Sequence, residues 1–370
     1  MPDPARAPRY TAAEVPGLRR DLAEWYGSPS GVQYYYQALL IGQQQIRPPG
    51  PPDRVARHLA AGEAGRLREG DLWYVDDDLC ALLASAHPSM PAFAPRPSDL
   101  PSKVGFAVFA EPIAAYPAAV TRRDDVVELL AAAGGGGAEL RDRADRLYAD
   151  QARIVAVSWG PVDNPNWPAG GLWMSFYAAS QLHFGDIIDD PDTARRARAM
   201  LPPLTVDNEA AIAWRPDGAP VDGYLLPSGD QQPGTLAWAR LVFAAFQLAA
   251  QANLAETEQQ RTPRPERRRT ERAQLPARDV RVIRLRRGLA TERDADPAAD
   301  GDREWRHRWV VRGHWRNQWY PSLADHRPKW IAPYLKGPAD APLLGGDKVT
   351  VATANPPQRP AEDTAADGDR

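Results

Sequence analysis

The chain has 370 residues, of which 43% are hydrophobic and 25% charged, a composition typical of a globular protein with room for two or three domains. The single cysteine, Cys80, excludes an internal disulfide framework, and no run of about 18 apolar residues predicts a membrane span. The N-terminus lacks the apolar segment of a secretory signal, so we expect a cytoplasmic protein without a membrane partner.

The first 99 residues have the pattern of a helical region. Leu18, Leu22 and Trp25 recur at helical spacing, with Pro16 near the start and Gly27 as a stop. The last helix of the region is assigned to the segment that starts at Asp71, and Asp76 or Asp77 can cap it. The predicted helices cover residues 16–27, 31–46, 52–67 and 71–90.

Residues 100–257 predict an α+β core. Short apolar runs rich in Val, Phe and Trp, bounded by Pro and Gly, indicate strands. Residues 235–256 form the clearest helix of the chain, and because it is apolar on nearly every face we expect it to pack on the sheet. The Gly run at 134–137 lacks the residues of a phosphate-binding loop. The predicted strands are 103–113, 152–160, 170–179, 210–218 and 223–229.

The rest of the chain predicts a basic linker, a small domain and a tail. Residues 258–277 are polar, rich in Arg and broken by Pro, which indicates an extended linker. Residues 278–352 alternate as β-strands do and predict a small β-rich domain, and residues 353–370 predict a disordered tail. The expected fold class is therefore α+β, with a helical N-terminal region, a mixed core and a C-terminal β domain.

Charge is distributed unevenly along the chain. Residues 1–260 hold 22 Lys and Arg against 32 Asp and Glu, whereas residues 261–336 hold 20 against 10. A basic segment on an acidic body indicates an anionic partner such as DNA or RNA. The alternative is that the basic segment docks on the acidic body of its own chain.

The C-terminal segment interleaves Arg with Trp. In residues 305–316, Trp and Arg alternate, which on one strand would place the Arg side chains on one face and the Trp side chains on the other. Guanidinium groups bind phosphates, and exposed aromatic rings stack on bases. The predicted nucleic-acid-binding residues are Arg281, Arg284, Arg286, Arg306, Arg308, Arg312, Arg316, Trp315, Trp319, Tyr320, Arg327 and Lys329.

Two other interpretations of this segment stay open. The Trp residues could form the core of a small domain, with Trp305 and Trp309 as its first members. His314 between Arg312 and Arg316 could instead catalyse RNA cleavage in a toxin or defence effector, with Tyr320 or His326 as a second acid or base.

Other motifs predict little chemistry. His307, His314 and His326 do not have the spacing of a zinc site, and the acidic segment 183–192 lacks partner carboxylates at defined spacing. No cofactor-binding motif is present, so we expect no metal and no cofactor. A third hypothesis is an interaction scaffold whose Trp-rich face binds a partner protein.

The block VVRGHWRNQWYPS, followed by HRPKWIAPYLKGP, resembles the C-terminal signature of uncharacterised proteins from actinobacterial plasmids, phages and integrated elements. The segments DLPSKVGFAVFAEPI and VAVSWG resemble the middle of the same proteins. The resemblance covers about residues 70–350. It implies a mobile-element setting, in which DNA handling, transcription control, host conflict and phage defence are common tasks.

Overall fold

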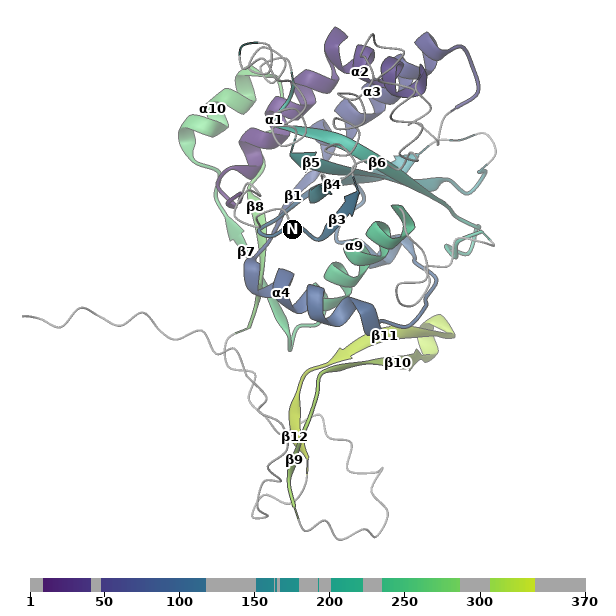
Figure 1. Ribbon diagram of the computed structural model, residues 1–370, viewed down its shortest axis with the longest axis vertical. Helices are drawn as coiled ribbons and strands as arrows, with labels where there is room; N and C mark the ends of the chain where they lie inside the picture. Colours follow the sequence, from purple (N-terminus) through teal and green to yellow (C-terminus); the bar gives the residue numbers. More distant parts are fainter. Residues whose placement is uncertain are drawn as a thin grey trace, which may run out of the picture. The chain divides into compact units, whose positions relative to one another are not determined.

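The computed structural model describes residues 9–40, 48–117, 151–162, 164, 167–179, 192, 201–221, 235–286 and 307–336. The chain divides into two compact units, one of residues 1–290 and 313–332 and one of residues 291–312 and 333–370. Helices and a mixed sheet build the first unit, which confirms the predicted α+β class (Figure 1).

A mixed sheet of eight described strands forms the centre of the first unit. Its order is β6-β5-β4-β2-β1-β8-β7, and β3 pairs with β4. The central strand β1 runs parallel to both β2 and β8, and the other pairs are antiparallel. The strands are β1 (Asp71–Val75), β2 (Gly105–Phe109), β3 (Ala114–Pro117), β4 (Gln151–Val162), β5 (Gly171–Ala179), β6 (Leu204–Ala213), β7 (Ala255–Gln260) and β8 (Val280–Leu285).

Helices cover both faces of the sheet (Figure 1). On one face α9 packs through aromatic side chains, with Phe246 edge-on to Trp159 at 5.2 Å and Trp238 edge-on to Phe176 at 5.5 Å between ring centroids. On the opposite face α3 meets β4 and β5. The helices are α1 (Val15–Tyr26), α2 (Pro29–Leu40), α3 (Pro52–Glu69), α4 (Asp77–Ala86), α9 (Thr235–Ala249) and α10 (Arg264–Arg272), with short 3₁₀ turns at His87–Ser89 (η2) and Pro97–Asp99 (η3).

The segment 71–90, predicted as one helix, divides into a strand and a helix. Asp71–Val75 is β1, buried between β2 and β8, and Asp76 caps α4 by accepting a hydrogen bond from the backbone N–H of Asp77. The apolar run LWYV fits a parallel strand with both faces covered, which short-range periodicity does not distinguish from a buried helix.

The predicted linker is ordered and belongs to the first unit. Its beginning is the end of β7, and Arg264–Arg272 forms α10. Pro265 occupies the first turn of α10, where a helix needs no backbone N–H donor, so proline does not interrupt it. The boundary expected at residue 278 is absent as well, because β8 joins the central sheet beside β1.

The C-terminal strands divide between the two units. The hairpin of β10 (His314–Tyr320), the turn η5 (Pro321–Leu323) and β11 (Asp325–Ile331) belongs to the first unit, whereas β9 (Trp309–Val311) pairs with β12 (Tyr334–Lys336) in the second. The alternation of Arg and Trp faces expected if residues 305–316 formed one strand is therefore wrong, because β9 ends at Val311 and β10 begins at His314. The predictions for residues 134–137, 183–191 and 223–229, for residues 337–352 of the predicted C-terminal domain and for the tail lie outside the described residues.

Candidate nucleic-acid interface

The β10–β11 hairpin is fixed to the body of the first unit by two of its three tryptophans. Trp315 and Trp330 face each other across the strands with ring centroids 5.4 Å apart. Trp330 is buried, and the indole N–H of Trp315 donates to the backbone carbonyl of Ala86 at the end of α4 (2.8 Å). Trp315, predicted to bind nucleic acid, therefore packs the hairpin onto the protein.

Arg327 has a structural role as well. Its side chain is only 5% exposed and forms an ion pair with Asp99. The same guanidinium donates to the carbonyl of Ala94 (2.5 Å) and lies 5.7 Å from the ring of Phe93. A buried guanidinium with these partners does not reach a phosphate, so the prediction for Arg327 is wrong.

Arg316 and Lys329 stand directly opposite each other on β10 and β11. Arg316 is exposed and Lys329 half-buried, and among the described residues neither forms an ion pair. Like charges in directly opposed positions of an antiparallel pair repel each other, because their Cβ atoms are about 5 Å apart. An anion placed between the two side chains would remove this repulsion.

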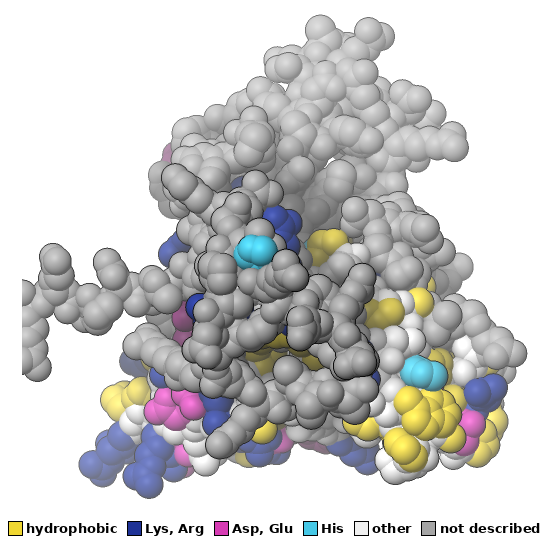
Figure 2. All heavy atoms as spheres, turned by 90° about the horizontal axis from the view of Figure 1, so that it is seen from below, with side chains coloured by type: hydrophobic (Ala, Val, Ile, Leu, Met, Phe, Trp, Pro, Cys, Tyr) yellow, Lys and Arg dark blue, Asp and Glu magenta, His cyan; other side chains and the backbone are white. Residues whose placement is uncertain are grey.

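Three large apolar side chains are exposed at the turn end of the hairpin, namely Trp319 and Tyr320 at the end of β10 and Leu323 in the turn. Their exposed fractions are 46%, 36% and 41%, unusually high for large hydrophobic side chains. The ring of Trp319 is tilted against that of His326 with 4.9 Å between centroids. Figure 2 shows hydrophobic side chains gathered around a histidine at its right-hand edge, with basic and acidic side chains beside them.

The arginines of β8 are engaged by acidic residues of the chain itself. Arg281 pairs with Asp71 (3.0 Å) and lies over the ring of Trp73 at 4.8 Å. Arg284 pairs with Asp76 (2.9 Å) and Glu258 (3.0 Å). Each of these two predicted phosphate ligands therefore has an acidic partner within the chain, and Arg281 shares Asp71 with Arg278.

Four other predicted arginines have different positions. Arg286 follows β8 and is exposed. Arg312 is exposed and Arg308 half-buried in the second unit, and both have interactions within the protein. Arg306 lies outside the described residues. The predicted common surface of Arg306, Arg308, Arg312 and Arg316 is not a single strand face, because Arg316 belongs to the hairpin of the first unit.

The predicted catalytic group is not assembled on the hairpin. His314 is exposed at the start of β10, whereas His326 pairs with Trp319 near the turn. Five register positions at about 3.3 Å each separate them by roughly 17 Å, and Tyr320 is one position farther. Neither residue is within hydrogen-bond reach of His314 as a second acid or base. Among the described residues no group of three His, Cys, Asp or Glu could hold a metal ion.

A buried polar cluster on the other side of the sheet was missed by the sequence interpretation. Glu63 of α3 is fully buried and accepts hydrogen bonds from the hydroxyls of Ser158 (2.8 Å), Ser175 (2.5 Å) and Tyr177, and it pairs with Arg66 (2.5 Å). Burial favours its neutral acid, but the Arg66 charge and the hydroxyl donors outweigh burial and lower the pKa of Glu63.

The signal for this cluster was present in the helix pattern. Leu59, Ala60, Glu63, Ala64 and Leu67 form the buried face of α3, so a carboxylate occupies an apolar position. Ser158 and Ser175 are register partners on β4 and β5. Because its carboxylate is fully buried and satisfied, the cluster is a structural element of the core.

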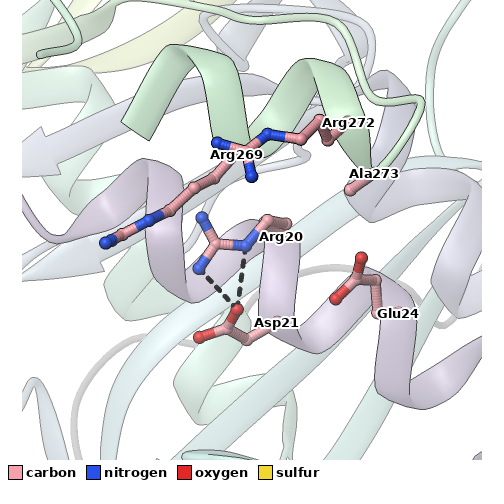
Figure 3. Close-up of a pocket in the computed structure, with 6 residues that line it drawn as sticks. All are labelled: Arg20, Asp21, Glu24, Arg269, Arg272 and Ala273. Carbon is pink, nitrogen blue, oxygen red and sulfur yellow. Dashed lines mark hydrogen bonds and ion pairs between the residues drawn. The ribbon is translucent and has the colours of Figure 1, made fainter. Parts of the chain in front are cut away.

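A shallow cleft of about 440 Å³ separates α1 from α10. Figure 3 shows Arg269 and Arg272 on the α10 side of the cleft and Arg20 of α1 below them, hydrogen-bonded to Asp21. Glu24 and Ala273 complete its lining. Mixed charges line this cleft, and most of its basic groups come from a segment that the sequence predicted as a linker.

Comparisons with protein-family models, with curated proteins and with solved structures found no match to the chain. Within the described segments, no helix has both the length and the apolar character needed to cross a membrane.

Proposed function

We propose that the protein binds single-stranded nucleic acid through the exposed end of the β10–β11 hairpin. The observation that carries the proposal is the opposed pair Arg316 and Lys329 on the same hairpin as the exposed rings of Trp319 and Tyr320. Proteins that bind single strands combine basic groups along the backbone with aromatic rings on which bases stack. Arg316 and Lys329 provide the basic groups, and Tyr320 lies on the same face of β10. Trp319 lies on the other face beside the turn, so a strand that contacts all four residues wraps around the end of the hairpin.

The supporting residues are fewer than the sequence predicted. Arg281, Arg284 and Arg327 have acidic partners of their own. The remaining site consists of Arg316, Lys329, Trp319 and Tyr320, with His326 behind Trp319. Stacking gives little sequence preference because every base has an aromatic face, so we expect binding of DNA and RNA alike.

The other two hypotheses are favoured less. A ribonuclease needs a second acid or base near His314, and the hairpin separates the candidates along its length. A protein-binding scaffold could use Trp319, Tyr320 and Leu323, but it gives no role to two opposed cations. The mobile-element setting implied by the sequence resemblance stays a prediction.

The proposal is tested by fluorescence anisotropy with labelled poly-thymidine and poly-uridine oligonucleotides at about 50 mM salt. We expect Trp319→Ala to weaken binding by about 1–3 kcal/mol, which is roughly 5- to 150-fold, because one stacked base is lost. We expect Arg316→Gln combined with Lys329→Gln to weaken binding and to reduce its salt dependence.

Two variants control for general effects. Leu40→Ala removes an exposed apolar side chain of α2, and Arg57→Gln removes an exposed charge of α3. Both should bind as the parent protein does. The proposal is wrong if the parent protein binds no single strand at this salt concentration, or if Trp319→Ala binds with unchanged affinity. Binding of a protein partner that Trp319→Ala abolishes, without nucleic acid, would favour the scaffold.

A further inference from the structure

We infer that α10 is a second nucleic-acid contact, separate from the hairpin, which binds the phosphate backbone of a duplex. The inference goes beyond the proposed function because it concerns a different element and a different form of the ligand.

Arg264, Arg268 and Arg272 lie along one side of α10, and Arg272, at the end of the helix, also lines the cleft beside α1. Residues four apart lie on one side of a helix and are separated by about 6 Å along its axis, so the three guanidinium groups span roughly 12 Å. All three are exposed, and among the described residues none of them forms an ion pair with an acidic group. Arg261, just before the helix, is exposed as well.

The other charged residues of α10 are directed elsewhere. Glu266 is nearly buried and pairs with Arg20 of α1 and with Arg269. Arg267 pairs with Asp279 at 3.1 Å. Glu271 is exposed at the edge of the arginine face. The Glu266 carboxylate therefore holds the inward side of α10 against α1. The exposed side of the helix presents mostly positive charge.

The body of the first unit fixes α10 at both sides and at its end. Thr270 is buried, and the Glu266 carboxylate holds Arg20. After the helix, the backbone N–H groups of Gln274 and Leu275 donate to the carbonyls of Glu271 and Thr270 (both 3.0 Å), which is a Schellman motif, and Leu275 is buried. The arginine face is therefore presented by a rigid element.

Duplex nucleic acid is the anionic partner that fits this face. A duplex carries one negative charge per roughly 1.7 Å of its axis, so a straight row of cations meets several phosphates at once. On this side of α10 the exposed apolar side chain is the small ring of Pro265, which gives little area to enter a membrane, and no aromatic ring is present to stack on a base. The Asp21 and Glu24 carboxylates on the α1 side of the cleft would repel a polyanion near Arg272, which directs the contact toward Arg264 and Arg268 (Figure 3).

The test is a salt titration of binding to a duplex of about 20 base pairs, followed by anisotropy. The variant replaces Arg264, Arg268 and Arg272 by Gln, which keeps helix propensity. Its matched control replaces three exposed arginines away from α10 by Gln, namely Arg9, Arg54 and Arg57. Unchanged circular dichroism and melting temperature verify that both proteins fold.

We expect the slope of log Kd against log salt to fall by about 2.7 in the α10 variant, since each lost phosphate contact removes roughly 0.9. The control should keep the parent slope, and Glu271→Gln should strengthen duplex binding several-fold. Single-strand binding through the hairpin should change less than about twofold in the α10 variant.

Each result decides between the two proposals. An unchanged duplex slope in the α10 variant, or no duplex binding by the parent protein, overturns the inference and leaves the hairpin proposal standing if single strands still bind. Equal loss of duplex binding in Trp319→Ala would show one common surface and overturn the separation of sites. Binding to anionic phosphatidylserine vesicles, lost in the α10 variant, with no duplex binding would assign the face to a membrane surface instead.

Discussion

Glu63 and Arg66, one turn apart on α3, form an ion pair of 2.5 Å in which the carboxylate is fully buried and the guanidinium side chain is 12% exposed. The pair joins α3 to the sheet, since the same carboxylate accepts from Ser158 of β4 and Ser175 of β5. One buried carboxylate thus joins α3 to two neighbouring strands of the sheet.

Replacing one partner of this pair should destabilise the protein strongly. We expect Glu63→Ala to lower the free energy of unfolding by about 3–5 kcal/mol, because it leaves the Arg66 charge uncompensated and three hydroxyls without their acceptor. Urea unfolding measures the change. Glu69→Gln, on the exposed side of the same helix, should change stability by less than about 0.5 kcal/mol. A cost below about 1 kcal/mol for Glu63→Ala would contradict the described network.

Asp207 should lower the free energy of unfolding as pH rises, which is the opposite of the usual effect of a carboxyl group. Burial raises the pKa of this β6 carboxyl from 3.8 to about 6. Between about pH 4 and pH 6 the folded protein keeps a proton that the unfolded chain has lost, so this residue's contribution to stability falls as pH rises. Below that window both states are protonated, and above it both are charged.

Asp207→Asn should therefore raise stability above about pH 6 and leave it little changed below about pH 4. The expected gain is about 1–2 kcal/mol, less than the pKa difference alone would give, because the side chain is half-buried and water screens its charge. Urea unfolding of both proteins from pH 4 to pH 8 measures the difference. A gain that does not vary with pH would contradict the raised pKa.

Arg327 should be needed for docking of the hairpin. We expect Arg327→Met to cost about 2–4 kcal/mol, because Asp99 loses its buried partner and the Ala94 carbonyl its donor. Hydrogen exchange of the β10 and β11 amides should speed up more than exchange in β4 and β5. Arg316→Met on the opposite strand is the matched control and should leave exchange unchanged.

Replacing Gln274 by glycine should stabilise the end of α10. Its φ of 57° lies in the left-handed region, which favours glycine at the end of a Schellman motif. We expect Gln274→Gly to raise the free energy of unfolding by roughly 0.5–1 kcal/mol, measured in urea. Ala273→Gly, one residue earlier with a φ of −75°, should lower it. A loss of stability in Gln274→Gly would contradict this backbone conformation.

The sequence by itself determined those helices and strands whose pattern of apolar residues lies within about a dozen consecutive residues. The helical spacing of Leu18, Leu22 and Trp25 predicted α1, and the apolar run of residues 235–249 predicted α9, because amphipathic and apolar helices carry their periodicity in themselves. The strands β2, β4 and β5 and the α+β class followed from short apolar runs bounded by Pro and Gly.

Only the tertiary structure decided which charges face solvent. Arg327 pairs with Asp99 across 228 residues of sequence, and Arg281 and Arg284 pair with Asp71 and Asp76 across 210 and 208. The sequence could count these arginines as basic groups but not assign their partners, since an ion pair depends on which strands become neighbours. The same holds for α10: its prolines and arginines indicate a linker when read locally, and its contacts with Arg20, Asp279 and the core make it a helix.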